Sequence, residues 1–138
     1  SRNAPEQAII ASNTSTLSIT EMATAVKHPE NFIGLHFFNP APIMQLLEIV
    51  RGKKTSDETV QFAKDLAGRL GKTPVVSIDS PGFIANRVAL PIIIEAITAL
   101  EEGVATKEDI DTALKLGYNH PMGPLQLADL VGLDTVLH

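Results

Sequence analysis

The sequence predicts an α/β fold over residues 1–79 that gives way to an all-helical fold over residues 80–138. Short apolar runs and helix-like segments follow one another up to residue 79 in the order strand, helix, strand, strand, helix, strand. After Asp79-Ser80-Pro81-Gly82, only segments with helical periodicity and helix-start signals follow. Hydrophobic residues make up 44% of the 138 residues and charged residues 20%, the balance of a globular chain.

The first part should contain four strands and two helices. The strands are expected at residues 8–11, 33–38, 44–50 and 75–78. The segment Asn39-Pro40-Ala41-Pro42 should end the second strand, because proline lacks the amide hydrogen that a sheet ladder needs. Ser18-Ile19-Thr20-Glu21 is a capping box, which predicts a helix ending near Lys27. Ser56 or Thr55 should cap a second helix, which runs to about Leu70.

Three helices are expected in the second part. The first, at residues 83–102, is apolar on nearly all sides, as in a helix inside a bundle or at a subunit interface. Thr106-Lys107-Glu108-Asp109 is another capping box and predicts a helix to about Leu116. Gly123-Pro124 predicts one more helix, because proline is favoured at the first helical position.

Composition excludes several classes of partner. Lys and Arg number 11 and Asp and Glu 16, and the resulting net charge of −5 argues against broad nucleic-acid binding. The absence of cysteine rules out disulfides and Cys-ligated zinc. The longest apolar stretch, residues 88–100, contains Pro91 and Glu95 and is too short to span a bilayer. We therefore expect neither a nucleic-acid partner nor a membrane partner.

Both ends of the sequence suggest an excerpt from a longer protein. The chain starts at Ser1 and enters an apolar run almost at once, and it stops inside an apolar-periodic segment. A targeting peptide would lie at the true N-terminus, which an excerpt would not show, so a cytoplasmic location is only the default expectation.

His36 is the histidine with the clearest candidate partner. If strands 33–38 and 44–50 form an antiparallel hairpin about Pro42, His36 lies directly opposite Glu48. A carboxylate beside one imidazole nitrogen fixes the tautomer and leaves the other nitrogen free for proton transfer. A lone histidine on an apolar strand is more often a hydrogen-bonded core residue. From the residues alone, a catalytic pair and a structural pair are equally open.

Two further polar groups have a functional and a structural interpretation. Ser12-Asn13-Thr14-Ser15 follows a strand, at the edge where open α/β sheets bind ligands, but such residues also form ordinary hydrogen-bonded turns. Asn86 lies on an apolar helix and makes either a packing hydrogen bond or a ligand contact. The remaining histidines are expected to be solvated or to lie in turns: His28, His120 and His138.

Five segments appear in a recognisable order: SNTSTLSIT, GLHFFNPAPIMQLLEIVRG, SPGFIANR, GVATKEDIDTALKLG and NHPMGPLQLADLVGLD. In the second segment, a glutamate follows the histidine of HFFNP by 12 residues. The asparagine of PGFxxNR, in the third segment, follows the same histidine by 50 residues. This combination resembles the L-3-hydroxyacyl-CoA dehydrogenase family over residues 8–134, and short bacterial 3-hydroxybutyryl-CoA dehydrogenases look nearest.

The resemblance implies a fold and an activity. Residues 1–79 would be the second part of a Rossmann-type dinucleotide-binding domain, and residues 80–138 an incomplete helical domain for dimerisation and substrate binding. The implied cofactor is NAD. The implied reaction, part of fatty acid β-oxidation, interconverts L-3-hydroxyacyl-CoA, expected to be a short chain such as 3-hydroxybutyryl-CoA, and 3-ketoacyl-CoA. The implied partners are the acyl-CoA substrate and a second copy of the chain in a homodimer.

The resemblance also assigns roles to residues. His36 would be the general base, and Glu48 would orient its imidazole and stabilise the cationic form. Ser15 and Asn86 would be catalytic and would contact the substrate, with Asn86 as a donor toward the developing oxyanion. The implied residues at the nicotinamide end of the cofactor are Asn13, Ser15 and Asn39. No metal is implied, because hydride chemistry belongs to the cofactor.

The sequence departs from the family in one respect, and two alternative functions remain. The G-x-G-x-x-G turn that holds a dinucleotide is not found in it, so the main grip on the cofactor is expected on a preceding stretch. One alternative is a related dehydrogenase of a free 3-hydroxy acid. The other is a non-catalytic fragment with only a dimerisation role. The presence of all four catalytic candidates together argues against this second alternative.

Overall fold

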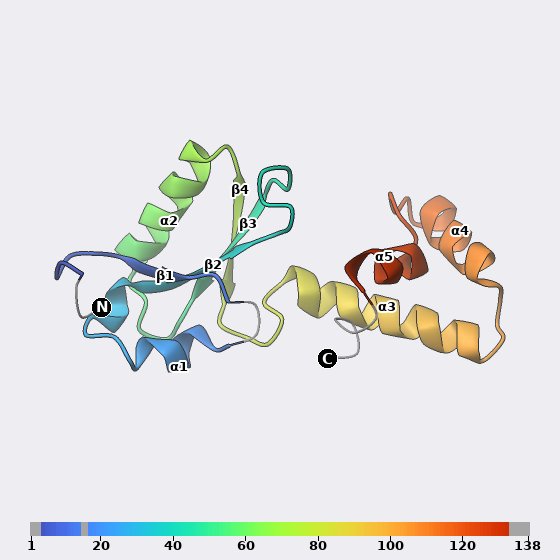
Figure 1. Cartoon of the computed structure of the whole chain (residues 1–138), viewed down its shortest axis with the longest axis horizontal. Helices are drawn as coiled ribbons and strands as arrows, with labels where there is room; N and C mark the ends of the chain where they lie inside the picture. The colour runs from blue at the N-terminus through green and yellow to red at the C-terminus, as the bar shows by residue number, and fades with distance from the viewer. Residues whose placement is uncertain (1–3, 15–16, 133–138) are drawn as a thin grey trace. The chain divides into compact units, whose positions relative to one another are not determined.

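The computed structural model describes residues 4–14 and 17–132 of the chain (Figure 1). The chain forms two compact units, Ser1–Ile84 and Ala85–His138. The sequence placed the change of character at residue 80. The first unit extends to Ile84 because the turn after the last strand brings the buried side chain of Phe83 into its core.

The first unit contains a four-stranded sheet in the order β1-β2-β3-β4. The strands are β1 (Ile10–Ser12), β2 (Phe32–Phe37), β3 (Leu46–Arg51) and β4 (Thr73–Ile78). β1 is parallel to β2, β2 is antiparallel to β3, and β3 is parallel to β4. The sheet direction therefore reverses once, between β2 and β3. The predicted succession of strands and helices along the chain is confirmed, and β2 and β3 form the antiparallel hairpin that the pairing of His36 with Glu48 assumed.

Several element boundaries differ from the prediction, and two of the differences have clear local reasons. β3 begins at Leu46, because Ile43 and Met44 both donate their backbone N–H to Pro40 O and extend the turn. Helix α1 (Ile19–Ala23) ends earlier than Lys27. The hydroxyl of Thr24 donates to Glu21 O at 2.6 Å, and the following backbone bonds are of the tighter i to i−3 kind. The predicted cap of α1 is correct, since Ser18 Oγ accepts from Glu21 N.

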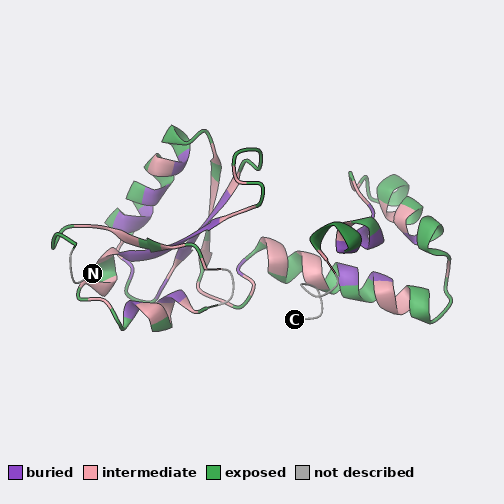
Figure 2. Ribbon diagram, in the orientation of Figure 1, coloured by how far each residue is buried: buried purple, intermediate pink, exposed green. Residues whose placement is uncertain are grey.

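The two faces of the sheet are covered by different helices (Figure 2). Helix α2 (Asp57–Arg69) packs through Val60, Ala63 and Ala67 on one face. That face of the sheet consists of Ile33, Leu35, Leu47 and Ile49. On the other face, α1 packs over Gly34, where a Cβ atom would lie 2.8 Å from Ile19 Cδ1. The absence of a side chain at position 34 therefore lets α1 approach the strand backbone.

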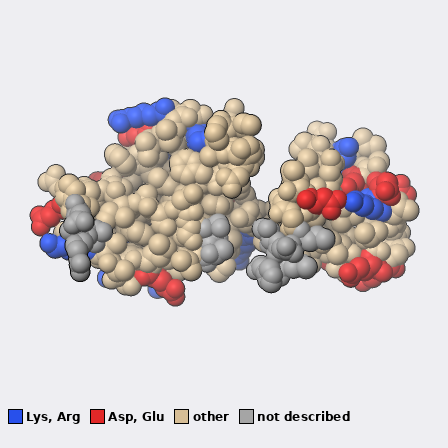
Figure 3. All heavy atoms as spheres, viewed as in Figure 1, with Lys and Arg blue, Asp and Glu red and all other residues tan. Residues whose placement is uncertain are grey.

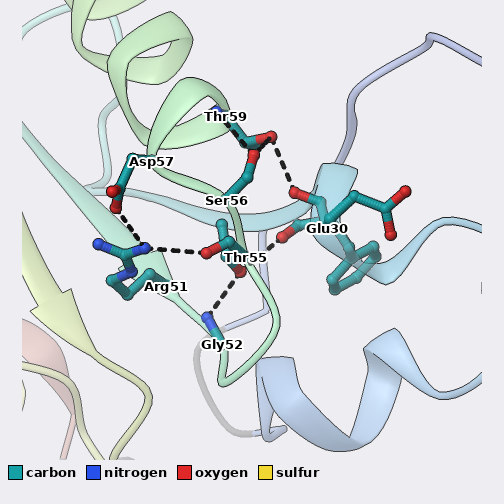
Figure 4. Close-up of polar contacts among 8 residues, drawn as sticks. Glu30, Arg51, Gly52, Thr55, Ser56, Asp57 and Thr59 are labelled. Atoms are coloured by element: carbon teal, nitrogen blue, oxygen red, sulfur yellow. Dashed lines mark hydrogen bonds and ion pairs between the residues drawn. The ribbon is translucent and has the colours of Figure 1, made fainter.

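Polar contacts fix the start of α2 against the sheet (Figure 4). Thr55 is buried, and its hydroxyl donates to Phe32 O at 2.8 Å and accepts from Gly52 N at 2.9 Å. Arg51 Nη2 donates to Thr55 O and also pairs with Asp57 Oδ1 at 2.8 Å. Of the two predicted caps, Ser56 and Thr55, Ser56 caps the helix, since its Oγ accepts from Thr59 N. β3 and α2 are thus joined by side chains on both sides of one short loop.

Over its described residues, 85–132, the second unit contains three helices: α3 (Ala85–Glu101), α4 (Lys107–Gly117) and α5 (Pro124–Val131). The predicted caps are correct, with Thr106 before α4 and Gly123 before α5. Gly123 has no side chain to cap α5. Asp111 on α4 takes that role, because its two carboxylate oxygens accept from Leu125 N at 2.8 Å and from Gln126 N at 3.0 Å. A Cβ atom at position 123 would overlap the Asp111 side chain, so α4 and α5 meet where only glycine fits.

Helix α3 is only partly enclosed by the other helices of this chain. Ile93 and Ala96 are buried against α5 and α4. Val88, Ile92 and Ile94 are 60%, 41% and 47% exposed. Within this chain α3 therefore keeps an apolar surface open. Among residues 4–14 and 17–132, no helix is long and apolar enough to cross a membrane.

Asp79 links the end of β4 to the start of α1. Its Oδ2 accepts from Ser18 Oγ at 2.6 Å and from Thr20 N at 2.9 Å, while its own N–H donates to Arg51 O. Partial burial acts to raise the pKa of Asp79, but the hydrogen bonds from Ser18, Thr20 and Ile19 outweigh it and hold that pKa below its usual value. The ionised carboxylate is therefore the form that stabilises the fold.

We expect Asp79→Asn to remove an acid-sensitive part of the stability. A carboxyl group with a lowered folded-state pKa stabilises the fold above its unfolded value of 3.8 and loses this effect as pH falls through the lower folded value. At pH 7 the variant should lose about 1–2 kcal/mol of unfolding free energy. Urea denaturation of the complete protein at a series of pH values measures both effects. Asp65→Asn, at an exposed position on α2, is the control, and an Asp79→Asn variant with the wild-type acid dependence would contradict the assignment.

Candidate active site

The predicted pairing of His36 and Glu48 is confirmed by the strand register. His36 on β2 lies directly opposite Glu48 on β3, which in turn lies beside Val75 on β4. The His36 Nδ1 atom is 3.0 Å from Glu48 Oε2. The two side chains are 9% and 0% exposed. A carboxylate in the middle of the sheet and an imidazole at its cross-strand position therefore form one buried pair.

The geometry of this pair leaves one imidazole nitrogen for other chemistry. With Glu48 ionised, the hydrogen of the bond belongs to His36 Nδ1, and Nε2 keeps its lone pair. If Nε2 takes up a proton, the imidazolium stays beside the carboxylate, so the buried positive charge is formed with its counter-charge in place. This arrangement matches that of a general base, His36, and a carboxylate that orients it, Glu48.

Two aromatic rings contact the imidazole. The centroid of the Phe38 ring is 4.6 Å from that of His36, with the two planes inclined by 56°. The centroid of Phe83 is 5.4 Å away in an edge-on arrangement at 65°. Phe38 follows β2, whereas Phe83 comes from the turn after β4. Sequence reasoning did not identify Phe83 as a neighbour of His36, because 47 residues separate them and no local pattern relates the two.

The other four predicted site residues lie in different parts of the chain. Asn13 lies near the pair in the fold, since its Oδ1 accepts from Phe37 N at 3.3 Å, next to His36. Asn39 is exposed and lies two residues after the end of β2. Asn86 is half-buried in the first turn of α3, in the second unit. Ser15 lies outside the described residues, so its predicted role stays a prediction.

Lys72 is a further residue that sequence reasoning missed. Its Nζ donates to Ala41 O at 2.6 Å and to Met44 O at 2.7 Å, and it lies 5.8 Å from the centroid of the Phe37 ring. In the sequence, a lysine directly after Gly71 indicates only a positive charge near the end of a helix. In the structure it fixes the loop between β2 and β3, residues 38–45, which contains Asn39 and leads into the strand that carries Glu48.

The described part of the chain offers no cluster of three or more His, Cys, Asp or Glu side chains that could hold a metal ion. Charged side chains in both units are visible in Figure 3, where most of the viewed surface belongs to other residues. The candidate site contains one imidazole–carboxylate pair with two aromatic neighbours.

Comparison with known proteins gives matches to both parts of the chain. Residues 1–80 match the family described as "3-hydroxyacyl-CoA dehydrogenase, NAD binding domain", and residues 82–138 match the C-terminal domain of the same family. The chain is 55% identical over 131 residues to a probable 3-hydroxybutyryl-CoA dehydrogenase of Deinococcus radiodurans, covering 95% of the chain and 47% of that protein.

A mammalian relative and a solved structure also match nearly the whole chain and are dehydrogenases of the same kind by name. The chain is 52% identical over 132 residues to the human mitochondrial hydroxyacyl-coenzyme A dehydrogenase, covering 96% of the chain and 42% of that protein. The crystal structure of (S)-3-hydroxybutyryl-CoA dehydrogenase from Ralstonia eutropha superimposes with a TM-score of 0.93 at 52% identity, covering 96% of the chain and 47% of that structure. The chain thus spans about half the length of the curated relatives it matches.

We expect Lys72→Met to loosen the loop between β2 and β3. Methionine keeps an apolar side chain beside Phe37 but donates no hydrogen bond to Ala41 O or Met44 O. Loss of two charge-assisted bonds should lower the unfolding free energy by about 1–2 kcal/mol. Amide hydrogen exchange at Ile43 and Met44 in the complete protein should accelerate. Lys64→Met, at an exposed position on α2, is the matched control; equal exchange rates in the two variants would refute the role.

Proposed function

The chain belongs to the 3-hydroxyacyl-CoA dehydrogenase family, and we propose that it carries the proton-transfer residues of an NAD-dependent oxidoreductase. The complete protein would interconvert a short-chain L-3-hydroxyacyl-CoA, such as 3-hydroxybutyryl-CoA, and the 3-ketoacyl-CoA. The single observation that carries the proposal is the buried pair in which Glu48 Oε2 lies 3.0 Å from His36 Nδ1. The relatives named 3-hydroxybutyryl-CoA dehydrogenase, at up to 55% identity, support the choice of substrate.

In the proposed mechanism His36 moves the proton. Nε2 accepts the proton of the substrate 3-hydroxyl group, because Nδ1 is already engaged by Glu48. The nicotinamide of bound NAD supplies the acceptor for the hydride that leaves carbon 3. Glu48 holds the imidazole in the correct tautomer and stabilises the imidazolium while the ketone forms. In the reverse direction, protonated His36 returns the proton to the oxygen.

The residues of the first unit fit the nicotinamide end of NAD. β1 and β2 are parallel and end at the same edge of the sheet, the edge where open α/β folds bind their ligands. Asn13 follows β1 and Asn39 follows β2 at that edge. Asn13 Oδ1 is held by Phe37 N, which fixes the amide group and presents its NH₂ as a donor. Asn13 and Asn39 would therefore line the nicotinamide end of the cofactor site. The G-x-G-x-x-G turn is not among residues 1–138.

Two further assignments are part of the proposal. Ser15 would contact the substrate oxygen and the nicotinamide. Asn86, in the first turn of α3, would donate to the oxyanion that develops at carbon 3. Two observations support these roles: SNTSTLSIT and SPGFIANR resemble motifs of the family, and both parts of the chain match that family.

We also propose that the complete protein forms a homodimer through its helical unit. The support is the apolar surface of α3, on which Val88, Ile92 and Ile94 are 41–60% exposed. Apolar side chains gathered on one helix are typical of a surface that another protein layer covers.

His36→Gln in the complete protein should lower kcat by about 10³-fold, because general-base catalysis contributes on the order of 10²–10⁴-fold. Glu48→Gln should lower kcat by about 10²-fold, because the neutral amide no longer stabilises the imidazolium. NADH binding, followed by fluorescence titration, should change less than about twofold in either variant, since neither residue is assigned to the dinucleotide grip. Steady-state oxidation of 3-hydroxybutyryl-CoA gives the rates.

His28→Gln is the matched control for this test. His28 also has a carboxylate neighbour, with Nδ1 3.2 Å from Glu30 Oε1, but its side chain is 37% exposed and it lies outside the sheet. The control should keep wild-type turnover. Wild-type turnover in His36→Gln would refute the proposed mechanism.

The substrate class is tested by comparing acetoacetyl-CoA with free acetoacetate under reduction by NADH. The proposal predicts that kcat/KM is at least about 10²-fold higher for the CoA ester, because binding of the CoA part contributes to orientation at the reacting carbon. Equal values for the two substrates would favour a dehydrogenase of free 3-hydroxy acids. An inactive complete protein would favour the purely structural role.

A further inference from the structure

Phe83 occupies an unusual backbone conformation directly after a glycine. Gly82 has φ 79° and Phe83 has φ 54°, so two successive residues lie in the left-handed region. The Phe83 N–H donates to Ser80 O at 2.9 Å and closes the turn. A bulky residue at positive φ is rare, and glycine or asparagine would form such a turn with less strain. The turn geometry alone therefore does not explain a phenylalanine at this position.

The ring of Phe83 is fixed by the core of the first unit. Phe83 is 6% exposed and belongs to the buried cluster on the α1 face of the sheet. The other buried members of that cluster are Ile19, Ala23, Phe32 and Val50. A strained backbone persists only where the surroundings determine it, and this buried cluster supplies that constraint. The position of the ring is therefore set by packing in this cluster.

The fixed ring contacts the imidazole that carries the proposed chemistry. The ring centroids of Phe83 and His36 are 5.4 Å apart, in an edge-on arrangement at 65°. Glu48 holds His36 through Nδ1, and one hydrogen bond leaves the imidazole able to swing about the bonded atom. The rings of Phe38 and Phe83 both contact the imidazole, and packing against two rings restricts such a swing.

We propose that Phe83 is a positioning residue, whose buried ring holds the His36 imidazole in the orientation that proton transfer at Nε2 requires. This inference rests on the proposed function of the His36–Glu48 pair. It assigns to that pair a residue from the segment that matches the C-terminal domain, which begins at residue 82. By its contacts Phe83 belongs to the first unit.

The test is Phe83→Leu in the complete protein, because leucine keeps an apolar side chain in the cluster and removes the ring. Phe32→Leu is the matched control: it is the same substitution in the same cluster, 4% exposed, on β2 four residues before His36. Both variants should lose a similar amount of thermal stability. Only Phe83→Leu should lower kcat for 3-hydroxybutyryl-CoA, by about tenfold, with KM for NAD changed less than about twofold.

A second readout does not depend on turnover. In protein labelled with ¹³C at histidine Cε1, the His36 signal is identified by its loss in His36→Gln. That signal should shift and broaden in Phe83→Leu and stay at its wild-type position in Phe32→Leu. An unshifted signal in Phe83→Leu, or equal changes of signal or kcat in the two variants, overturns the inference. If the wild-type protein does not oxidise 3-hydroxybutyryl-CoA, the proposed function fails, and the His36 signal alone decides the positioning role.

Discussion

The first unit is organised around the need to pair a carboxylate in the centre of a sheet. Glu48 is fully buried, and a buried carboxylate without a partner costs several kcal/mol. His36 can serve as its partner only if β2 and β3 hold one register, since a slip of one residue would carry the two side chains to opposite faces. The same register places Ile33, Leu35, Leu47 and Ile49 toward α2. The polar pair and the apolar core thus require the same strand alignment.

On the face of the sheet that α1 covers, the helix leaves space for the His36–Glu48 pair. α1 is only five residues long and packs over Gly34 and Val50. His36 lies two residues beyond Gly34 on the same face, and there Phe38 and Phe83 contact it instead of a helix. Asp79 joins the start of α1 to the strand that leads into the Phe83 turn. The short helix, the aromatic neighbours and the carboxylate link together define the surroundings of the imidazole.

Features encoded locally could be predicted from the sequence, and features that depend on distant residues could not. The caps at Ser18, Ser56 and Thr106 were predicted correctly, because a cap needs only one hydroxyl and the next turn of chain. The symmetry of the hairpin gave the His36–Glu48 pairing. Lys72, Asp79 and Phe83 were missed as positioning groups, because each acts on a segment about 30 to 60 residues away. The fold class is shown by the family matches, and the roles of Ser15 and Asn86 stay predictions.

The contact between Asp111 and Gly123 has a consequence for sequence drift in the helical unit. Gly103 has φ 71° with open space around it, so its restriction lies in its own backbone, and asparagine is the natural replacement. Gly123 has an ordinary φ of −69°, and its restriction comes from Asp111 on another helix. Among diverging descendants, position 103 can change alone. Position 123 can change only together with position 111, so the two should co-vary as a coupled pair.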